Sequence, residues 1–267
     1  MNQRPELSQQ IIWLTGASSG IGEALVKPLA SQCQHLIITA RNQQTLELVK
    51  DSSGYDNITC LSADITNRDQ LSQIAHEIEF VFGRIDTLIA NAGTCEYVDV
   101  KHFDAELFER VINTNLIGLA NCTEAALPLL RHSQRGYIAG MSSSVAWLPL
   151  PRAQAYGASK AATNHFLEAM KIDLAVENID VSIICPGFVK TPLTDKNDFP
   201  MPQRISADQA AVEIIKGLKK RDWQIHFPKK FTLMLKLIGL LPAGLRMAIT
   251  RSMSRQSLPQ HPTNTES

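Results

Sequence analysis

The chain has 267 residues, of which 44% are hydrophobic and 19% are charged. This length and composition are typical of one large α/β domain or two small ones, with ample residues for a core. The 26 Lys and Arg residues equal the 26 Asp and Glu residues in number, so the charge gives no support for a nucleic-acid-binding protein.

The leading segment MNQRPELSQQ is polar and runs directly into the apolar stretch IIWLT. It lacks the basic region and apolar core of a secretory signal, so we expect a cytoplasmic protein. The five cysteines are scattered and include no CxxC pair. They favour free thiols in a reducing compartment and argue against a zinc site.

Short apolar runs alternate with longer helical patterns along most of the chain. Candidate strands lie at residues 11–15, 35–40, 58–62, 87–90, 136–141 and 180–185, and candidate helices at 22–32, 68–82, 107–130, 154–177 and 207–221. This alternation is the signature of βαβ units, which build a parallel sheet covered by helices. No repeat or linker interrupts the pattern before about residue 190, which favours one domain.

The first candidate strand leads into TGASSGIG, residues 15–22. Three glycines at a turn from strand into helix let the backbone approach a ligand and present helix N-terminal amides to a phosphate. The spacing differs from the common G-x-G-x-x-G fingerprint, although the mechanics are the same. An ordinary tight turn is the alternative, and the strand before and helix after favour the phosphate site.

The second candidate strand ends in LIITARNQQ. An acid at this place would accept a hydrogen bond from the ribose 2′-hydroxyl of NAD, but here Ala40 is followed by Arg41 and Asn42. An arginine can pair with a 2′-phosphate through charge-assisted hydrogen bonds. The residues therefore favour NADP(H) over NAD(H), with a plain surface arginine as the alternative.

Later in the chain, QAYGASKAA places Tyr156 and Lys160 four residues apart, on one face of a helix. The pair is either an ordinary surface pair or an acid/base pair. A free tyrosine has a pKa near 10 and is a poor base at neutral pH, but nearby positive charge stabilises the phenolate and lowers that pKa. Lys160 is such a charge.

Several motifs follow one another in a fixed order: TGASSGIG, SADIT, NAG at 91–93, NTNLIG, MSSS at 141–144, YGASK at 156–160 and PGFVKT at 186–191. In order and spacing, residues 11–193 resemble the classical short-chain dehydrogenase/reductase family. The resemblance implies a single Rossmann-like, doubly wound α/β domain, with a mostly parallel sheet of about seven strands and helices on both faces. It also implies an NADP(H)-dependent oxidoreductase that transfers a hydride between nicotinamide and a carbonyl or secondary alcohol.

The catalytic residues that the resemblance implies are Asn115, Ser143, Tyr156 and Lys160. Tyr156 is expected to act as general acid/base, and Lys160 to lower its pKa and hold the nicotinamide ribose. Ser143 stands thirteen residues before Tyr156, the family's usual spacing, and is expected to orient the substrate oxygen. Asn115 is expected to bend its helix locally and hold a water of a proton relay.

The resemblance also implies a cofactor-binding set, with Asp64 at the adenine amino group, Ile65 beside the ring and Thr191 at the nicotinamide carboxamide. The full set is Gly16, Ser18, Ser19, Gly20, Ile21, Gly22, Arg41, Asn42, Asp64, Ile65, Asn91, Ala92, Gly93, Tyr156, Lys160, Pro186, Gly187, Val189 and Thr191. The histidines are scattered, and no metal site is predicted.

Two other functions compete with the oxidoreductase. A catalytically silent NADP(H)-sensing or interaction protein could use the same fold, but it would have no need of the complete Asn-Ser-Tyr-Lys set. A sugar-nucleotide epimerase or dehydratase generally has a longer chain, another glycine spacing and a substantial substrate domain. The oxidoreductase is therefore the leading hypothesis, although the fold cannot name its substrate.

We divide the chain into a dinucleotide-binding and catalytic domain at 1–227, with a substrate lid at about 188–206, a basic amphipathic helical segment at 228–255 and a polar tail at 256–267. Between Trp223 and Thr265 there are six Lys or Arg residues and no acid. Polar or small residues recur there at steps of three and four, which predicts a narrow stripe along a helix. They are Lys229, Thr232, Lys236, Gly239, Ala243, Arg246 and Thr250.

This segment is interrupted by Lys236, Pro242 and Arg246, so a membrane span is not expected. Three interpretations stay open: residues 229–251 contact an anionic membrane surface, form a subunit interface, or wall an apolar substrate pocket. We expect a small-molecule carbonyl or alcohol as substrate, no nucleic-acid partner, and a homodimer or homotetramer.

Overall fold

The structure is a computed structural model that describes residues 6–195 and 201–251. Its main feature is a seven-stranded parallel sheet in the order β3-β2-β1-β4-β5-β6-β9. The strands are β1 (Ile11–Thr15), β2 (His35–Ala40), β3 (Ile58–Ser62), β4 (Thr87–Ala90), β5 (Tyr137–Met141), β6 (Asp180–Pro186) and β9 (Gln224–Phe227). The chain winds outward from β1 in both directions, which confirms the predicted doubly wound fold class.

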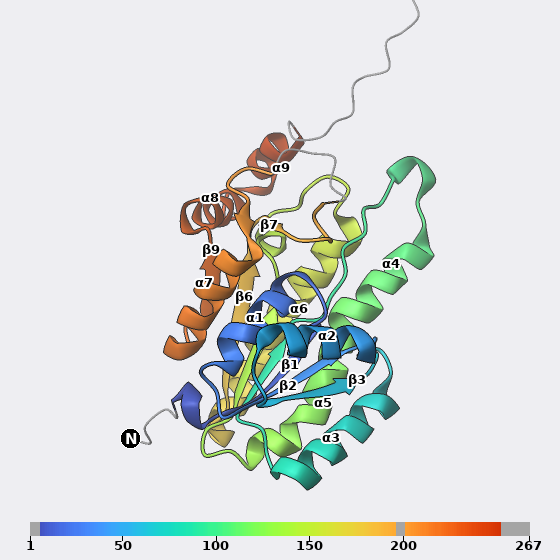
Figure 1. Cartoon of the computed structure of the whole chain (residues 1–267). Helices are drawn as coiled ribbons and strands as arrows, with labels where there is room; N and C mark the ends of the chain where they lie inside the picture. The colour runs from blue at the N-terminus through green and yellow to red at the C-terminus, as the bar shows by residue number, and fades with distance from the viewer. Residues whose placement is uncertain (1–5, 196–200, 252–267) are drawn as a thin grey trace, which may run out of the picture.

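Helices cover both faces of this sheet (Figure 1). One core lies between the sheet and α1 (Gly20–Ala30), α2 (Gln43–Ser53) and α7 (Ala207–Lys220). The other lies between the sheet and α3 (Arg68–Phe82), α5 (Gly118–Arg131) and α6 (Gln154–Leu174). Strand β1 shows why its sequence is continuously apolar: Ile12 and Leu14 enter the first core, while Ile11 and Trp13 enter the second.

The helical pattern predicted at 107–130 forms three consecutive segments. Helix α4 (Ala105–Ile112) leads into a π-helical turn, η3 (Asn113–Ile117), which leads into α5. Four short 3₁₀ helices complete the connections: η1 (Leu7–Gln9), η2 (Val100–His102), η4 (Ser144–Trp147) and η5 (Ala175–Glu177). The π-helical turn widens the helix at a position that carries a predicted site residue, Asn115.

The segment after β6 is fastened at its base. Strands β7 (Val189–Lys190) and β8 (Ile205–Ser206) pair as a separate two-stranded sheet. A capping box between Ser206 and Gln209 then starts α7. Of the predicted lid at 188–206, residues 196–200 lie outside the described residues, and so does the predicted tail at 256–267.

Two helices follow β9: α8 (Lys229–Gly239) and α9 (Ala243–Arg251). Figure 1 shows them together at one end of the molecule, beyond β9 and α7. Helix α8 packs on the 3₁₀ helix η4, where Phe231 and Leu235 form a small core with Leu148. The C-terminal helices are therefore joined to the segment that follows β5.

Candidate active site

The two central residues of the predicted site lie side by side on the first turns of α6. The Nζ atom of Lys160 lies 5.8 Å from the centroid of the Tyr156 ring. Lys160 is only 3% exposed, and its ammonium donates a 2.8 Å hydrogen bond to the backbone carbonyl of Met141, the last residue of β5. Burial lowers the pKa of Lys160 to about 8. The lysine therefore still carries its charge at neutral pH.

Tyr156 also contacts the segment that follows β5. Burial raises the pKa of its phenol, and the neighbouring Cys95 thiol raises it further, against an opposing effect of a hydrogen bond with Ser143. The half-buried Ser143 hydroxyl also accepts a 3.3 Å hydrogen bond from the amide of Val145, which starts η4. The phenol is therefore protonated at neutral pH and shares its surroundings with a serine hydroxyl and an ammonium.

Asn115 lies next to this group, in the π-helical turn, and is 2% exposed. Its side-chain oxygen accepts from the amide of Thr94 at 2.7 Å, and its amide nitrogen donates to the Thr94 carbonyl and the Ser159 hydroxyl, both at 2.9 Å. A Cβ on Gly93 would lie 3.0 Å from the Asn115 oxygen and 3.5 Å from Nζ of Lys160. Asn115 thus fastens the segment after β4 to α6 beside Lys160.

The glycine-rich turn forms a cradle of backbone at the start of α1. Gly16 and Gly20 have φ angles of +69° and +59°, which favour glycine, and a Cβ on Gly22 would lie 2.0 Å from the Gly16 carbonyl oxygen. The N-cap residue Ser19 has extended backbone and makes no side-chain cap, so its hydroxyl does not engage the first amides of α1. Open helix amides beside a turn whose glycines carry no side chain fit the phosphates of a dinucleotide.

Asn91 and Ala92 lie behind this turn. The Asn91 side chain donates to the carbonyl oxygens of Thr15 and Gly16, both at 3.1 Å. The Thr15 hydroxyl accepts from the backbone amides of Asn91 and Ala92, both at 3.2 Å. A Cβ on Gly16 would lie 2.6 Å from Cα of Ala92. The Asn91 side chain therefore holds the cradle in shape.

At the end of β2, Arg41 and Asn42 are exposed and play different parts. The Asn42 side chain caps α2 by accepting from the amide of Thr45 at 2.9 Å. No hydrogen bond or ion pair joins the Arg41 guanidinium to any residue within 6–195 or 201–251. The exposed Arg41 guanidinium can therefore bind an anion from solvent.

Asp64 and Ile65 follow the end of β3 and are both held by neighbouring residues. The half-buried Asp64 accepts from the amide and hydroxyl of Thr66 at 2.9 and 2.7 Å. Ile65 is buried against Gly118, where a Cβ would lie 2.5 Å from its Cδ1 atom, and its carbonyl accepts from Asn121 at 3.0 Å. The Asp64 carboxylate and the Ile65 side chain are thus held in place directly after β3.

The segment after β6 approaches the glycine-rich turn. The amide of Gly187 donates to the carbonyl of Phe227 at 2.7 Å, which continues the β6–β9 pairing that ends at Pro186. The methyl of Thr191 lies 3.1 Å from where a Cβ of Gly20 would be. Val189, between them, is buried in the first core. This segment therefore closes over the start of α1.

Three of the supporting residues were not singled out from the sequence. Thr15 and Ser159 lie inside the motifs TGASSGIG and YGASK, and Thr94 directly follows NAG, so position within a motif was a usable signal for them. Cys95 is different. Burial raises its pKa to about 11, and its effect on Tyr156 comes from a spatial proximity that sequence spacing does not indicate.

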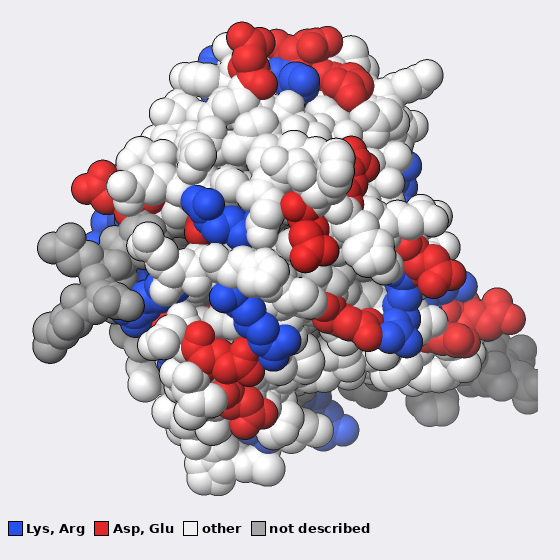
Figure 2. Space-filling view, turned by 90° about the horizontal axis from the view of Figure 1, so that it is seen from below, with Lys and Arg blue, Asp and Glu red and all other residues white. Residues whose placement is uncertain are grey.

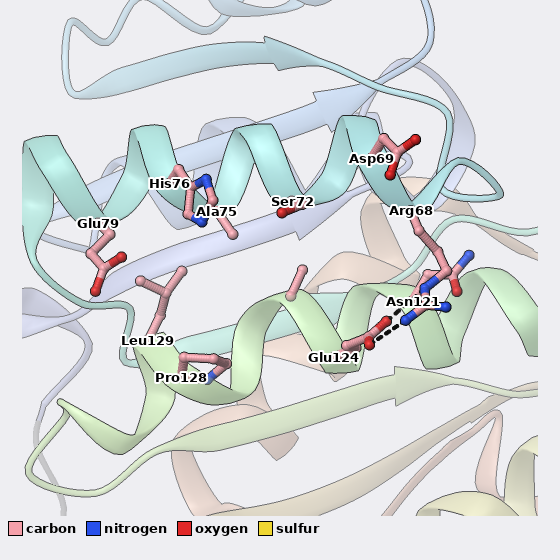
Figure 3. Close-up of a pocket in the computed structure, with 11 residues that line it drawn as sticks. Arg68, Asp69, Ser72, Ala75, His76, Glu79, Asn121, Glu124, Pro128 and Leu129 are labelled. Carbon is pink, nitrogen blue, oxygen red and sulfur yellow. Dashed lines mark hydrogen bonds and ion pairs between the residues drawn. The ribbon is translucent and has the colours of Figure 1, made fainter.

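Two cavities lie outside the Tyr156 region. One, of about 410 Å³, lies between α3 and α5 and contains none of the predicted site residues (Figure 3). Its side chains have mixed charges, with Arg68 turned toward Glu124 in an exposed ion pair. The other, of about 600 Å³, is bordered by Gly20 and Thr191 and runs between α1 and α7. The second cavity therefore adjoins the glycine-rich turn.

Within 6–195 and 201–251, no three His, Cys, Asp or Glu side chains lie together in a way that could hold a metal ion. In that same part of the chain, no helix combines the length and apolarity needed to cross a bilayer.

Known proteins resemble this chain in sequence and in fold. A family model described as short chain dehydrogenase matches residues 10–200. An uncharacterized oxidoreductase of Myxococcus xanthus is 30% identical over 250 residues, which are 93% of this chain and 99% of that protein. The 11-beta-hydroxysteroid dehydrogenase 1A of Arabidopsis thaliana is 38% identical over 194 residues, which are 71% of this chain but only 55% of the plant protein.

Solved structures share the fold at lower identity. A short chain dehydrogenase/reductase from Burkholderia phymatum, crystallised in complex with NAD, has a TM-score of 0.80 and 20% identity, with 88% of this chain and 94% of that chain covered. A short-chain type dehydrogenase/reductase from Mycobacterium marinum has a TM-score of 0.75 and 24% identity, with 83% and 93% covered.

Proposed function

Because the chain belongs to the short-chain dehydrogenase family of NAD(P)-dependent oxidoreductases, we propose that it is an NADP(H)-dependent reductase of a carbonyl compound, with Tyr156 as its general acid/base. The observation that carries the proposal is the placement of Lys160: a buried ammonium 5.8 Å from the ring of a tyrosine that is hydrogen-bonded to Ser143. A structural role alone gives no reason to place a buried ammonium beside these two half-buried hydroxyl groups.

When bound, the nicotinamide supplies a hydride to the carbonyl carbon, or accepts one from an alcohol. The Tyr156 hydroxyl gives its proton to the carbonyl oxygen as negative charge develops there. The Ser143 hydroxyl hydrogen-bonds the same oxygen and orients the carbonyl. The Lys160 ammonium stabilises the phenolate that remains, until a proton from solvent restores it.

The cofactor would be held from four sides of the cradle. The amides at the start of α1 would bind the phosphates, Asp64 the adenine and Thr191 the nicotinamide carboxamide. Arg41 would pair with the 2′-phosphate, and what supports this preference for NADP(H) is its free, exposed guanidinium at the end of β2. We propose that the other residues of the predicted cofactor-binding set also contact the bound cofactor.

The same proposal includes the division of the chain at residue 227, the lid at 188–206 and a homodimeric or homotetrameric assembly. A cytoplasmic location is proposed from the cysteines, since all five are free thiols and suit a reducing compartment. Light scattering of the purified full chain would test the assembly, and a monomer would contradict it.

The variant Tyr156→Phe tests the catalytic role. It keeps the ring but removes the proton donor, so we expect kcat for NADPH-dependent reduction of a panel of ketones and aldehydes to fall by roughly 100- to 10,000-fold. Binding of NADPH, followed by calorimetry, should be nearly unchanged. Tyr55→Phe, which removes the hydroxyl of an exposed tyrosine, is the matched control.

Retained turnover in Tyr156→Phe would reject that residue as the acid/base. Failure of the unaltered protein to bind either NADPH or NADH would reject the oxidoreductase altogether. NADPH binding without turnover across the panel, together with an unchanged Tyr156→Phe variant, would favour a silent nucleotide sensor.

A further inference from the structure

The two C-terminal helices bury their threonines against the rest of the protein. Thr232 and Thr250 are buried, and the Thr232 hydroxyl shares a 2.7 Å hydrogen bond with Nδ1 of His226. Gly239 packs so closely on η4 that a Cβ there would lie 2.4 Å from the Trp147 carbonyl oxygen. Of the stripe of polar and small residues predicted from the sequence, Thr232, Gly239 and Thr250 thus lie on the face that packs on the protein, whereas Lys229 and Ala243 are exposed.

Large apolar side chains occupy the opposite face. On α8, Leu233 and Leu237 are 53% and 59% exposed, and Leu240, the C-cap residue that follows the helix, is 82% exposed. Their spacing of four and three residues places them in one line along the helix. Met234 on α8 and Leu245 and Met247 on α9 are exposed as well. Single exposed leucines are common in soluble proteins, but a line of them next to further apolar residues marks an interaction surface.

Basic residues flank this apolar line, and neither helix carries an acid. Lys229 and Lys230 are exposed at the start of α8, and Arg251 is exposed at the end of α9. The face of the molecule shown in Figure 2 differs from this pattern, because its acidic and basic side chains are interspersed. A positive, apolar surface on α8 and α9 is complementary to a partner that is negatively charged outside and apolar beneath.

We infer that the exposed face of α8 and α9 binds the surface of an anionic lipid bilayer, with the leucines among the acyl chains and the lysines at the phosphate groups. A twofold contact between two copies is less suitable, because it would bring the basic ends of α8 and α9 together with no acid on either helix to pair with them. The binding is peripheral and needs neither cofactor nor turnover.

The test is flotation of the full chain with vesicles in a density gradient. We expect it to float with vesicles of equal parts phosphatidylcholine and phosphatidylglycerol, and to float far less with phosphatidylcholine alone or at high salt. The double variant Leu237→Ser/Leu240→Ser should lower partitioning by at least about tenfold. The control Ile172→Ser/Val176→Ser removes two exposed apolar residues elsewhere and should leave flotation unchanged.

Charge is tested in the same way. Lys229→Gln/Lys230→Gln should lower partitioning onto the anionic vesicles by roughly 25-fold, since each basic residue near the surface contributes about fivefold. Lys216→Gln/Lys219→Gln neutralises two exposed lysines on α7 as the control. Circular dichroism and thermal unfolding would verify that each variant is folded.

Three results would overturn the inference: no flotation of the unaltered protein with anionic vesicles, flotation of the α8 variants equal to that of the controls, or equal flotation with neutral vesicles. A dimer that the leucine variant dissociates, with no vesicle binding, would assign the face to a second subunit instead. Because none of these measurements uses turnover, they separate this inference from the proposed reductase activity.

Discussion

Lys160 buries an ammonium group that donates to the carbonyl of Met141. Burial lowers its pKa from 10.5 to about 8, so the folded protein holds this proton less tightly than the unfolded chain does. Carrying the charge at neutral pH therefore reduces the free energy of unfolding. The residue proposed to support Tyr156 destabilises the fold, which is a common property of functional sites.

The variant Lys160→Met is accordingly expected to be more stable than the unaltered protein at pH 7, by up to about 3 kcal/mol, while losing activity. The penalty is complete below pH 8 and disappears as the pH rises toward 10.5, because the unfolded chain then also loses the proton. Urea unfolding of both proteins at several pH values measures the difference. A variant that is less stable at pH 7 would contradict this account.

Arg41→Ala tests the choice of cofactor. Removing the guanidinium that we propose as the partner of the 2′-phosphate should raise the KM for NADPH by roughly tenfold or more, since charge-assisted hydrogen bonds are the stronger kind. The KM for NADH should change little, because NADH lacks that phosphate. Steady-state kinetics with both cofactors provides the comparison, and equal changes would mean that Arg41 does not select between them.

Much of the candidate site at the residue scale could be predicted because its residues stand in continuous motifs. Tyr156 and Lys160 are one helical turn apart, and helix geometry alone places them together. The hydrogen bonds of Asn115 to Thr94 and Ser159 could not be predicted, since they join three elements that meet only in the folded chain. The effect of Cys95 on Tyr156 depends on the same packing.

At the element scale, the strands were predicted best where turn residues bound a short apolar run on both sides. β1, β2, β3 and β4 begin and end at the predicted residues, because turn residues bound their apolar runs. β9 was not predicted, since Gln224–Phe227 is a short run that mixes polar and apolar residues and becomes a strand by pairing with β6. The inward face of α8 likewise depends on Trp147 and His226, which lie far apart in the sequence.

The contact between α8 and η4 leads to a prediction at the same scale. In Gly239→Ala the new methyl would lie 2.4 Å from the Trp147 carbonyl oxygen, so α8 must shift, at a cost of about 1–3 kcal/mol. Gly244→Ala, on α9, meets no atom within 4 Å and should be neutral or slightly stabilising. Chemical unfolding of the two variants compares them, and equal stabilities would mean that α8 packs loosely.

At the scale of the whole molecule, Arg221 joins the end of α7 to the starts of two strands. Its guanidinium donates to Asp180 at 2.6 Å and to the carbonyls of Arg135 and Gly136 at 3.1 and 3.3 Å. Burial opposes ionisation of Asp180, but hydrogen bonds from Arg135 and Arg221 outweigh it and keep the pKa of Asp180 below its ordinary value. This network closes the sheet at β5 and β6.

Arg221→Met should therefore lower the free energy of unfolding by about 1–3 kcal/mol, because two carbonyls lose a donor while Asp180 keeps its ion pair with Arg135. The stabilisation is present above the unfolded Asp pKa of about 3.9 and is lost as the pH falls through the lower folded value, so the variant should lose less stability on acidification. Denaturant midpoints between neutral and acidic pH measure this. Arg68→Met, which breaks an exposed ion pair, should change stability by less than about 1 kcal/mol.

The contact of α8 with η4 has an optical consequence. Of the three tryptophans, Trp13 is fully buried in the sheet and Trp223 has the Lys171 ammonium 4.8 Å from its ring centroid. Trp147 has the Lys236 ammonium 4.5 Å from its ring centroid and the centroid of the perpendicular His226 ring at 6.1 Å. Lys236 lies on α8 and leaves the indole when α8 moves away, whereas His226 lies on β9, in the central sheet. Trp147 is the last residue of η4, the short helix that Ser143 caps. Its fluorescence is therefore expected to change when the C-terminal helices leave their packed position.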